Sequence, residues 1–264
     1  MTKRLILITG GSSGIGKAAA TALHAQGDFV LLQARNLDKL QAAAHDIDPT
    51  GKRIHYYSTD LTAPRDVEAS AKAIVQEHGL PDCVINCAGE GEWLSVLESN
   101  PDHYAQTIAS PYLATALTCK VFYDLMKERG SGHFIIVNSA AAYFSFPGAT
   151  GYIPSRWALL GFSKALQADL HSTNFTVSSV VFGKVDTPYF SNNPISESRI
   201  PKIADWLIPT LTAQQAGQRI AKTVKHPKSE VLAPFMLGVL VVLNRIFPGS
   251  FRWLLRITGY KRPL

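Results

Sequence analysis

The stretch LILITGGSSGIG, residues 5–16, joins a short apolar run typical of a buried strand to a glycine-rich turn. An alanine-rich pattern typical of a helix then begins at Lys17. In this context Gly10 permits a tight turn, Gly14 lets a pyrophosphate approach the backbone, and Gly16 allows the helix to pack closely on the strand. The free N–H groups and positive dipole end of the helix would face the phosphates. The stretch therefore predicts a dinucleotide-binding turn rather than an ordinary glycine-rich loop.

Length and composition favour one large globular domain. The 264 residues are 46% hydrophobic and 17% charged, which excludes a disordered chain and leaves enough apolar residues for a substantial core. The three cysteines, Cys83, Cys87 and Cys119, suit a reducing compartment better than a disulfide framework. We therefore expect a cytoplasmic protein in which Cys83 and Cys87 are buried thiols. The eight histidines show no spacing typical of metal ligands, so no metal site is predicted.

Strand-like and helix-like patterns alternate along most of the chain. After the first strand and helix, strands are predicted at 29–33, 53–58, 83–86, 133–138 and 175–181, and helices at 37–47, 65–78, 111–129 and 152–171. Such alternation is typical of βαβ units. It predicts an α/β fold with a single-domain, Rossmann-like, doubly wound parallel sheet over residues 1–233, followed by an apolar and basic extension at 234–264.

The end of the second predicted strand carries a signal for the type of dinucleotide. In sheets of this kind an acidic residue here binds the ribose 2′-hydroxyl of NAD. The chain has Arg35 at this point and no carboxylate before Asp38. Because a guanidinium can bind a 2′-phosphate through two hydrogen bonds, Arg35 favours NADP(H) over NAD(H). The alternative is that Arg35 is only a solvated charge at the end of a strand.

Several motifs resemble those of short-chain dehydrogenases/reductases over residues 4–233. They are TGGSSGIG at 9–16, STDL at 58–61, NCAG at 86–89, and the single residues Ser139, Tyr152 and Thr187. Within that family, ARN at 34–36, Cys87 after Asn86, and MKERG at 126–130 most resemble 3-ketodihydrosphingosine reductases.

The resemblance implies roles for residues along the cofactor. Asp60 would accept a hydrogen bond from the adenine amino group, Asn86 would stabilise the sheet beside the cofactor, and Thr187 would bind the nicotinamide carboxamide. The full implied set is Thr9, Gly10, Ser12, Ser13, Gly14, Ile15, Gly16, Arg35, Asp60, Leu61, Asn86, Ala88, Gly89, Tyr152, Arg156, Val185 and Thr187. The resemblance also implies a substrate lid at about 188–210, where Trp206, Leu207 and Ile208 suggest a hydrophobic substrate; plain packing of a surface helix is the alternative.

The resemblance further implies that Tyr152 is the general acid in carbonyl reduction and that Ser139 hydrogen-bonds the substrate carbonyl. Their thirteen-residue separation matches the spacing in the family. Hydride arriving at a carbonyl carbon builds negative charge on the oxygen, so a donor must already point there. A phenol of ordinary pKa near 10 acts slowly at neutral pH unless a nearby cation lowers that pKa. The family places a lysine four residues after the tyrosine, on the same helix face.

Two positions depart from the family pattern. Arg156 stands where the family has that lysine, and Thr107 aligns with an asparagine that anchors the relay water. An arginine supplies positive charge but not the compact, rotatable ammonium of lysine. Two functions remain open. One is an NADPH-dependent oxidoreductase acting on a carbonyl or secondary alcohol of a hydrophobic, lipid-like substrate, with Tyr152, Ser139 and Arg156 as catalytic residues. The alternative is a catalytically weak NADP(H)-binding homologue with a regulatory or scaffolding role.

The basic charge of the chain is concentrated in its last part. The net charge is +6, and five basic residues but no acidic residue follow Glu230. The apolar run at 231–243 is too short to span a bilayer. Beyond it, 250–257 places Arg252 and Arg256 on one helical face and offers Trp253 as an interfacial anchor, a pattern typical of an in-plane membrane helix. A subunit contact in a homo-oligomer is the rival interpretation. The body lacks a basic face interleaved with aromatic residues, so nucleic-acid binding is not expected.

Overall fold

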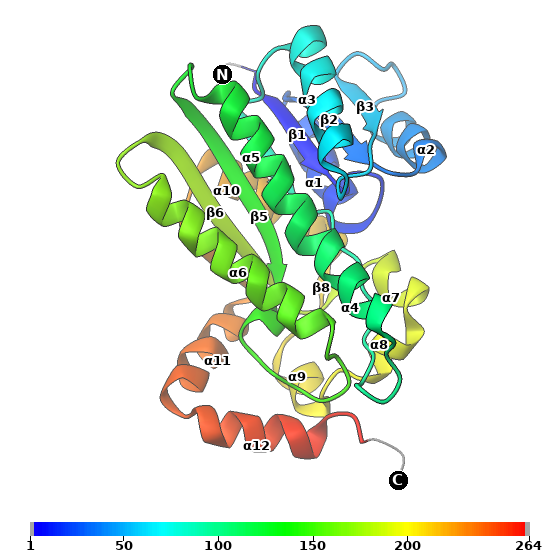
Figure 1. Ribbon diagram of the computed structural model, residues 1–264, viewed down its shortest axis with the longest axis vertical. Helices are drawn as coiled ribbons and strands as arrows, with labels where there is room; N and C mark the ends of the chain where they lie inside the picture. The colour runs from blue at the N-terminus through cyan, green and yellow to red at the C-terminus, as the bar shows by residue number, and fades with distance from the viewer. Residues whose placement is uncertain (1–2, 262–264) are drawn as a thin grey trace.

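The computed structural model describes residues 3–261, and its core is a seven-stranded parallel sheet (Figure 1). The strand order is β3-β2-β1-β4-β5-β6-β9. The strands are β1 (Leu5–Thr9), β2 (Phe29–Ala34), β3 (Ile54–Ser58), β4 (Cys83–Asn86), β5 (Ser131–Ser139), β6 (Asn174–Phe182) and β9 (Glu230–Ala233). The order reverses at β1, which pairs with both β2 and β4. The predicted doubly wound α/β sheet is confirmed.

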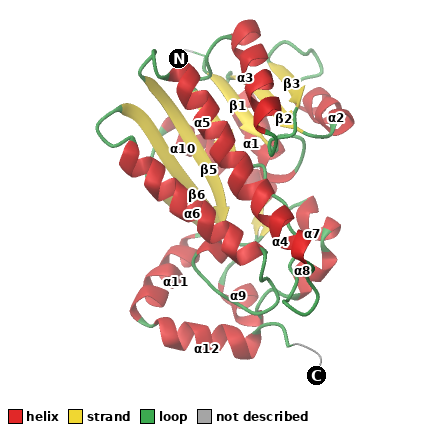
Figure 2. Cartoon of the chain, viewed as in Figure 1, coloured by secondary structure: helices red, strands yellow, loops and turns green. Residues whose placement is uncertain are grey.

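Helices cover both faces of the sheet (Figure 2). On one face lie α1 (Gly14–Ala25), α2 (Leu37–Ile47) and α10 (Ala213–Lys225), and on the other α3 (Pro64–His78), α5 (Ala114–Met126) and α6 (Tyr152–Asp169). Because successive side chains of a strand point to opposite faces, Ile6 and Ile8 pack into the first layer and Leu7 into the second. Both faces are therefore buried, which explains the almost continuous apolar runs of the strands.

The helix that precedes β5 differs from the prediction. It begins at Pro101 as α4 (Pro101–Ile108), passes through a π-helical turn at Ala109–Leu113, and continues as α5. Pro111 lies inside that turn, where its missing N–H interrupts the α-helical ladder. The expected helix start at Pro111 was therefore wrong: the proline marks an interruption, and the side chain of Asn100 caps the true start by accepting from the His103 N–H at 2.8 Å.

The apolar run at 231–243 is divided between two elements. Its first residues form β9, which completes the sheet beside β6, and the rest begins α11 (Phe235–Ile246). A bend of 118° separates α11 from α12 (Pro248–Thr258). Within residues 3–261 no single helix has the length and apolar composition to cross a membrane, although the bent pair together does.

Short elements connect β6 to α10 at the carboxyl ends of the strands. They are β7 (Val185–Asp186), α7 (Pro188–Asn192), α8 (Pro194–Ser198), α9 (Lys202–Leu207) and β8 (Leu211–Thr212), with β7 and β8 forming a separate two-stranded sheet. Helices α9, α11 and α12 gather below these strand ends (Figure 1). Helix α10 was not predicted; a capping box between Thr212 and Gln215 fixes its start.

The close packing of α10 on α1 leads to a prediction about Gly217. A Cβ at Gly217 would lie 2.4 Å from the carbonyl oxygen of Ala18, so Gly217→Ala must separate the two helices. We expect the free energy of unfolding to fall by about 2–3 kcal/mol, the cost of overpacking, in urea denaturation. Gly161 is the matched control, because a Cβ there meets nothing within 4 Å. Gly161→Ala should raise the stability of α6 by about 0.5–1 kcal/mol, and an equal loss in both variants would contradict the packing argument.

Candidate active site

A cavity of about 510 Å³ opens at the carboxyl ends of the strands, beside the point where the strand order reverses. Open α/β sheets bind their ligands at this point. The cavity is lined by the glycine-rich turn, the ends of β2, β4 and β5, the first turn of α6, and the segment after β7. All of the predicted cofactor and catalytic residues line it except Thr9 and Asn86.

The glycine-rich turn has the geometry of a phosphate cradle. Gly10 has φ +66° and Gly14 has φ +53°, a left-handed conformation that favours glycine. A Cβ at Gly16 would lie 2.3 Å from the carbonyl oxygen of Gly10, so this glycine lets α1 start tightly against the turn. The Ser13 side chain makes no capping hydrogen bond to the first turn of α1. The first N–H groups of that helix are therefore available to an anion.

Thr9 and Asn86 support the cavity from beneath. Both are buried, and they are paired in register across β1 and β4. Thr9 Oγ1 accepts from the Ala88 N–H at 3.2 Å, and Asn86 Nδ2 donates to the carbonyl of Ile135 on β5 at 3.4 Å. Asn86 thus joins β4 to β5, and neither Thr9 nor Asn86 lines the cavity.

Polar groups surround the end of the cavity at β2 and β3. The Arg35 guanidinium pairs with Glu90 at 2.5 Å, and both side chains are more than half exposed. One oxygen of Asp60 accepts from the Thr62 N–H at 2.9 Å and hydroxyl at 2.7 Å. These bonds lower the pKa of Asp60, and the second carboxylate oxygen has no hydrogen-bond partner within the described chain. This end of the cavity therefore offers a guanidinium and an oriented carboxylate.

Ser139 and Tyr152 also line the cavity. Ser139 is the last residue of β5, and Tyr152 is the first residue of α6. The Tyr152 ring is buried against Trp93, with ring centroids 5.1 Å apart, and against Tyr189 at 6.4 Å. The Asn138 side chain donates to the Arg156 carbonyl at 3.1 Å, which ties the end of β5 to the first turn of α6. A hydroxyl and a phenol thus line the same cavity as the phosphate cradle.

A family model described as short chain dehydrogenase matches residues 4–197. The chain belongs to the short-chain dehydrogenase family.

Relatives of this short-chain dehydrogenase cover most of its length. An uncharacterized oxidoreductase of Mycobacterium bovis is 33% identical over 238 residues, 88% of this chain and 67% of the relative. A 3-ketodihydrosphingosine reductase of Mus musculus is 30% identical over 224 residues, 83% of this chain and 66% of the relative. The predicted family is confirmed, and its 3-ketodihydrosphingosine reductases are among the relatives.

Solved structures confirm the fold. An alcohol dehydrogenase from Thermococcus sibiricus, complexed with 5-hydroxy-NADP, superposes with a TM-score of 0.74 at 26% identity, covering 88% of this chain and 96% of that one. An actinorhodin polyketide ketoreductase with NADPH gives a TM-score of 0.79 at 22% identity, covering 89% and 97%.

Arg156 of this short-chain dehydrogenase lies beneath the predicted acid. It is buried, and its guanidinium carbon is 4.7 Å from the centroid of the Tyr152 ring, a cation–π contact. No acidic residue in 3–261 forms an ion pair with it, and its buried Nε has no hydrogen-bond partner there. A Cβ at Gly89 would be only 3.0 Å from Nη2, so that glycine makes room for the guanidinium. The cavity therefore has a cationic wall beside Tyr152.

Thr107, the other departure from the family pattern, lies in α4, before the π-helical turn that interrupts the helix. Its hydroxyl donates to the His103 carbonyl at 2.8 Å within α4, and the π-helical turn follows at Ala109–Leu113. His103 itself is buried, and its Nε2 has no hydrogen-bond partner among the described residues. A Cβ at Gly151, next to Tyr152, would be 2.6 Å from Thr107 Oγ1 and 2.7 Å from His103 Nε2. The residue beside the predicted acid is glycine because no side chain fits there.

Apolar side chains line the part of the cavity beyond Tyr152. Residues of the segment after β7 contribute Ile203, Leu207 and Ile208, and the last two helices contribute Leu240, Phe251, Leu254 and Leu255. Trp206, which we expected among the apolar residues of the lid, points outward and is 79% exposed. The C-terminal extension therefore forms a wall of the site, a role that the sequence did not reveal.

Two basic residues fasten the segment after β7. Lys184 pairs with Glu197 at 3.0 Å and with Asp205 at 3.7 Å. The buried Arg199 donates to the carbonyls of Trp93 and Gly148, and pairs with Glu98 at 2.5 Å. The Arg199 contacts bind the segment to the loops that follow β4 and β5.

Several residues of this site were missed in the sequence. Glu90 and Trp93 follow the NCAG motif closely, and that proximity was a usable signal. Tyr189, Lys184 and Arg199 belong to the segment around the lid, where only tertiary contacts reveal their partners. Cys83 is buried as expected, whereas Cys87 is only partly buried and lines the cavity.

The Arg199–Glu98 pair makes a prediction about acid stability. Hydrogen bonds from Arg199 and Ser95 lower the pKa of Glu98 from 4.5 to about 2. The stabilisation is complete above the ordinary pKa and is lost as pH falls through the folded-state pKa. We expect Glu98→Gln to lower the free energy of unfolding by about 1–2 kcal/mol at pH 7. This loss is smaller than that from breaking a fully buried ion pair, because Glu98 is partly exposed.

Urea denaturation of the wild type and of Glu98→Gln at a series of pH values would measure the difference between their free energies of unfolding. This difference should become smaller as pH falls from 4.5 towards 2. Glu128→Gln, an exposed change on the loop after α5, should have no effect. A difference that is independent of pH would contradict the role of the pair.

Proposed function

We propose that this short-chain dehydrogenase is an NADPH-dependent reductase of carbonyl groups on hydrophobic substrates, with the reverse oxidation of secondary alcohols. The observation that carries the proposal is that Ser139 and Tyr152 line one cavity together with the glycine-rich turn. The strands of the sheet lie between Leu5 and Ala233, and the last two helices add an apolar wall to the cavity at their carboxyl ends.

The residues present fit NADP(H). The uncapped start of α1 suits the pyrophosphate, Asp60 suits the adenine amino group, and Arg35 suits a 2′-phosphate. Glu90 would give up its exposed pair with Arg35, which costs little because such pairs are weak in water. Val185 and Thr187 line the same cavity, and we expect them to bind the nicotinamide carboxamide. NADPH supplies the hydride when bound; two relatives of known structure were solved with NADPH or a derivative of NADP.

In the proposed reaction two hydrogen-bond donors, Ser139 and Tyr152, act on the substrate carbonyl beside the cationic Arg156. Ser139 hydrogen-bonds the carbonyl oxygen and orients it, and Tyr152 delivers the proton to that oxygen as negative charge develops on it. Arg156 stabilises the phenolate that Tyr152 leaves, because its guanidinium is close, buried and without an ion pair. The packing of Trp93 and Tyr189 on the Tyr152 ring holds the phenol in place.

The apolar part of the cavity defines the substrate class. A substrate carbonyl placed at Ser139 would extend its carbon chain along Ile203, Leu207 and Leu254. Burying apolar surface there favours binding by about 25 cal/mol per Å². The segment at about 188–210 acts as the lid over this chain. The substrate is therefore hydrophobic and lipid-like.

Replacing Tyr152 by phenylalanine tests the function. Tyr152→Phe keeps the ring contact with Trp93 and removes only the donor, so we expect turnover of an apolar ketone to fall at least about 100-fold. NADPH affinity, followed by cofactor fluorescence, should change less than about twofold. Tyr104→Phe is the control, since that hydroxyl bonds only Ser99 and Thr150 in the described chain. Undiminished turnover in Tyr152→Phe would overturn the proposal.

The second candidate function is an NADP(H)-binding homologue with weak catalysis and a regulatory or scaffolding role. The observation that favours it is Arg156, whose guanidinium lies on the face of the Tyr152 ring instead of bonding an acceptor. The two functions differ in whether the site depends on this arginine.

Arg156→Lys separates the two. If the site is adapted to arginine, the shorter lysine loses the cation–π contact and its packing, and we expect kcat to fall about tenfold or more. Lys164→Arg, an exposed change on the same helix, should leave kcat unaltered. A large gain of kcat in Arg156→Lys would instead support the weakly active homologue.

We also propose that the last two helices place this protein on anionic membrane surfaces. Phe251, Leu254 and Leu255 line the cavity, so they do not belong to the outer surface of α12. The outer surface nevertheless exposes Ile246, Phe247 and Trp253, each by more than half, beside the exposed Arg245, Arg252 and Arg256. Apolar and cationic side chains together suit a lipid headgroup region. The rival use of this surface is a contact between copies of the chain in a homo-oligomer.

Flotation with vesicles decides between them. We expect the protein to float with anionic vesicles at low salt, and to float about tenfold less when Arg252 and Arg256 are both changed to glutamate. Lys225→Glu with Lys228→Glu gives the same charge change elsewhere and should have little effect. Equal flotation of the two double variants, or none of the wild type, would contradict membrane binding.

A further inference from the structure

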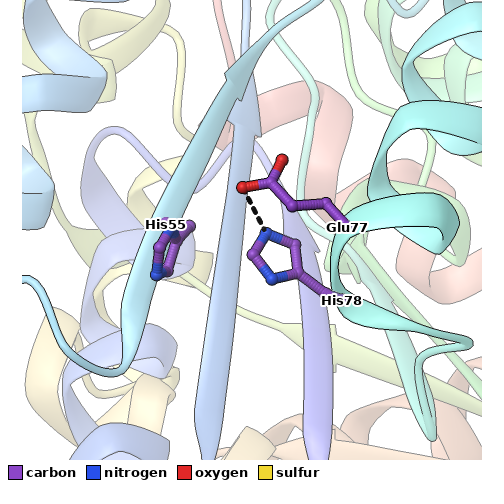
Figure 3. A group of neighbouring side chains, drawn as sticks. All are labelled: His55, Glu77 and His78. Atoms are coloured by element: carbon purple, nitrogen blue, oxygen red, sulfur yellow. Dashed lines mark ion pairs between the residues drawn. The ribbon is translucent and has the colours of Figure 1, made fainter.

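Two histidines and a glutamate converge on the face of the sheet covered by α3, away from the cavity (Figure 3). His55 is the second residue of β3, the edge strand, and Glu77 and His78 are the last two residues of α3. None of the three lines the proposed active site. Their meeting is a product of the fold, since β3 and the end of α3 are separated in the sequence.

The distances between the donors suit a small ion. One ligand atom from each residue lies within 4.8 Å of the others, and His78 Nε2 is 3.5 Å from Glu77 Oε1. Zn–N and Zn–O bonds of 2.0–2.2 Å at tetrahedral angles put neighbouring donors about 3.4 Å apart. His78 and Glu77 are already at that separation. The His55 imidazole needs to approach by at most about 1.4 Å, which a side-chain rotation supplies.

The surroundings orient the Glu77 carboxylate and leave the His78 Nε2 without a hydrogen-bond partner in the described chain. The Tyr57 hydroxyl donates to the second oxygen of Glu77 at 2.6 Å, as supporting groups around metal sites do for ligating carboxylates. The Phe29 ring stacks on His55, with ring centroids 5.2 Å apart. His78 Nε2 is buried and has no hydrogen-bond partner in the described chain, a costly state for a ring nitrogen unless a ligand satisfies it.

We propose that His55, Glu77 and His78 bind a divalent transition-metal ion, Zn²⁺ above all, with water completing a tetrahedron. Two imidazoles with one carboxylate favour Zn²⁺ over Mg²⁺ and Ca²⁺, which prefer oxygen ligands. The bound ion would link the edge strand to the end of α3 and stabilise that corner of the sheet. The site is independent of the reductase chemistry, and the absence of a recognised ligand spacing explains why the sequence predicted no metal.

Zinc binding by the untagged full chain tests the proposal. After chelator treatment, isothermal titration should give one Zn²⁺ per chain at pH 7 with a Kd in the micromolar range or below. Saturating Zn²⁺ should raise Tm by about 5 °C, because an ion that binds only the folded state stabilises it. Titration with Mg²⁺ should show no binding at these concentrations.

Variants locate the ion. His55→Ala should weaken Zn²⁺ binding at least about 100-fold, and Glu77→Gln, which keeps the acceptor for Tyr57, about tenfold. Both positions are partly or well exposed, so these changes spare the core, and circular dichroism checks that each variant is folded. The controls are His45→Ala and Glu68→Gln, which change exposed residues on α2 and α3. Absence of Zn²⁺ binding, or binding that His55→Ala and Glu77→Gln leave unchanged, would overturn the proposal.

Discussion

The geometry of the site depends on one close backbone contact, between the turn after β1 and the turn after β4. A Cβ at Gly10 would lie 2.8 Å from the Ala88 nitrogen, and Thr9 Oγ1 accepts from that same nitrogen. The two turns meet because β1 and β4 are neighbours at the point where the strand order reverses. Beyond this contact the helices diverge, and the crevice between them becomes the cavity.

Positive charge is distributed unequally around that cavity. Arg35 is exposed and paired with Glu90, so it can exchange its partner for a phosphate at little cost. Arg199 is buried and fully engaged with Glu98 and two carbonyls, so it anchors the segment after β7. Arg156 is buried without an ion pair in the described chain, a state that is costly unless a ligand or a phenolate balances the charge. The three arginines therefore differ in role: Arg35 can change its partner, Arg199 is structural, and Arg156 carries a charge that is available to a ligand or a phenolate.

The sequence predicted most of the sheet because its signals are local. The segments at 37–47 and 83–86 have the predicted bounds, since strong periodicity and short apolar runs define them. Local signals failed where one pattern supports two structures. Pro111 resembles a helix start but lies in a π-helical turn, and the apolar run at 231–243 begins as β9 before it becomes a helix. Contacts between distant segments, such as Arg199 with Glu98 or His55 with His78, have no local sequence pattern that predicts them.

The central claim is that this cavity is built for NADP(H), with Arg35 on the 2′-phosphate. Its most direct test is a fluorescence titration of the wild type and Arg35→Ala with NADPH and with NADH at one ionic strength. We expect the wild type to bind NADPH at least about tenfold more tightly than NADH, since a charge-assisted contact with the phosphate contributes about 1.5–3 kcal/mol. Arg35→Ala should remove that preference and leave NADH affinity nearly unchanged. Equal affinity of the wild type for the two dinucleotides, or no binding of either, would contradict the account.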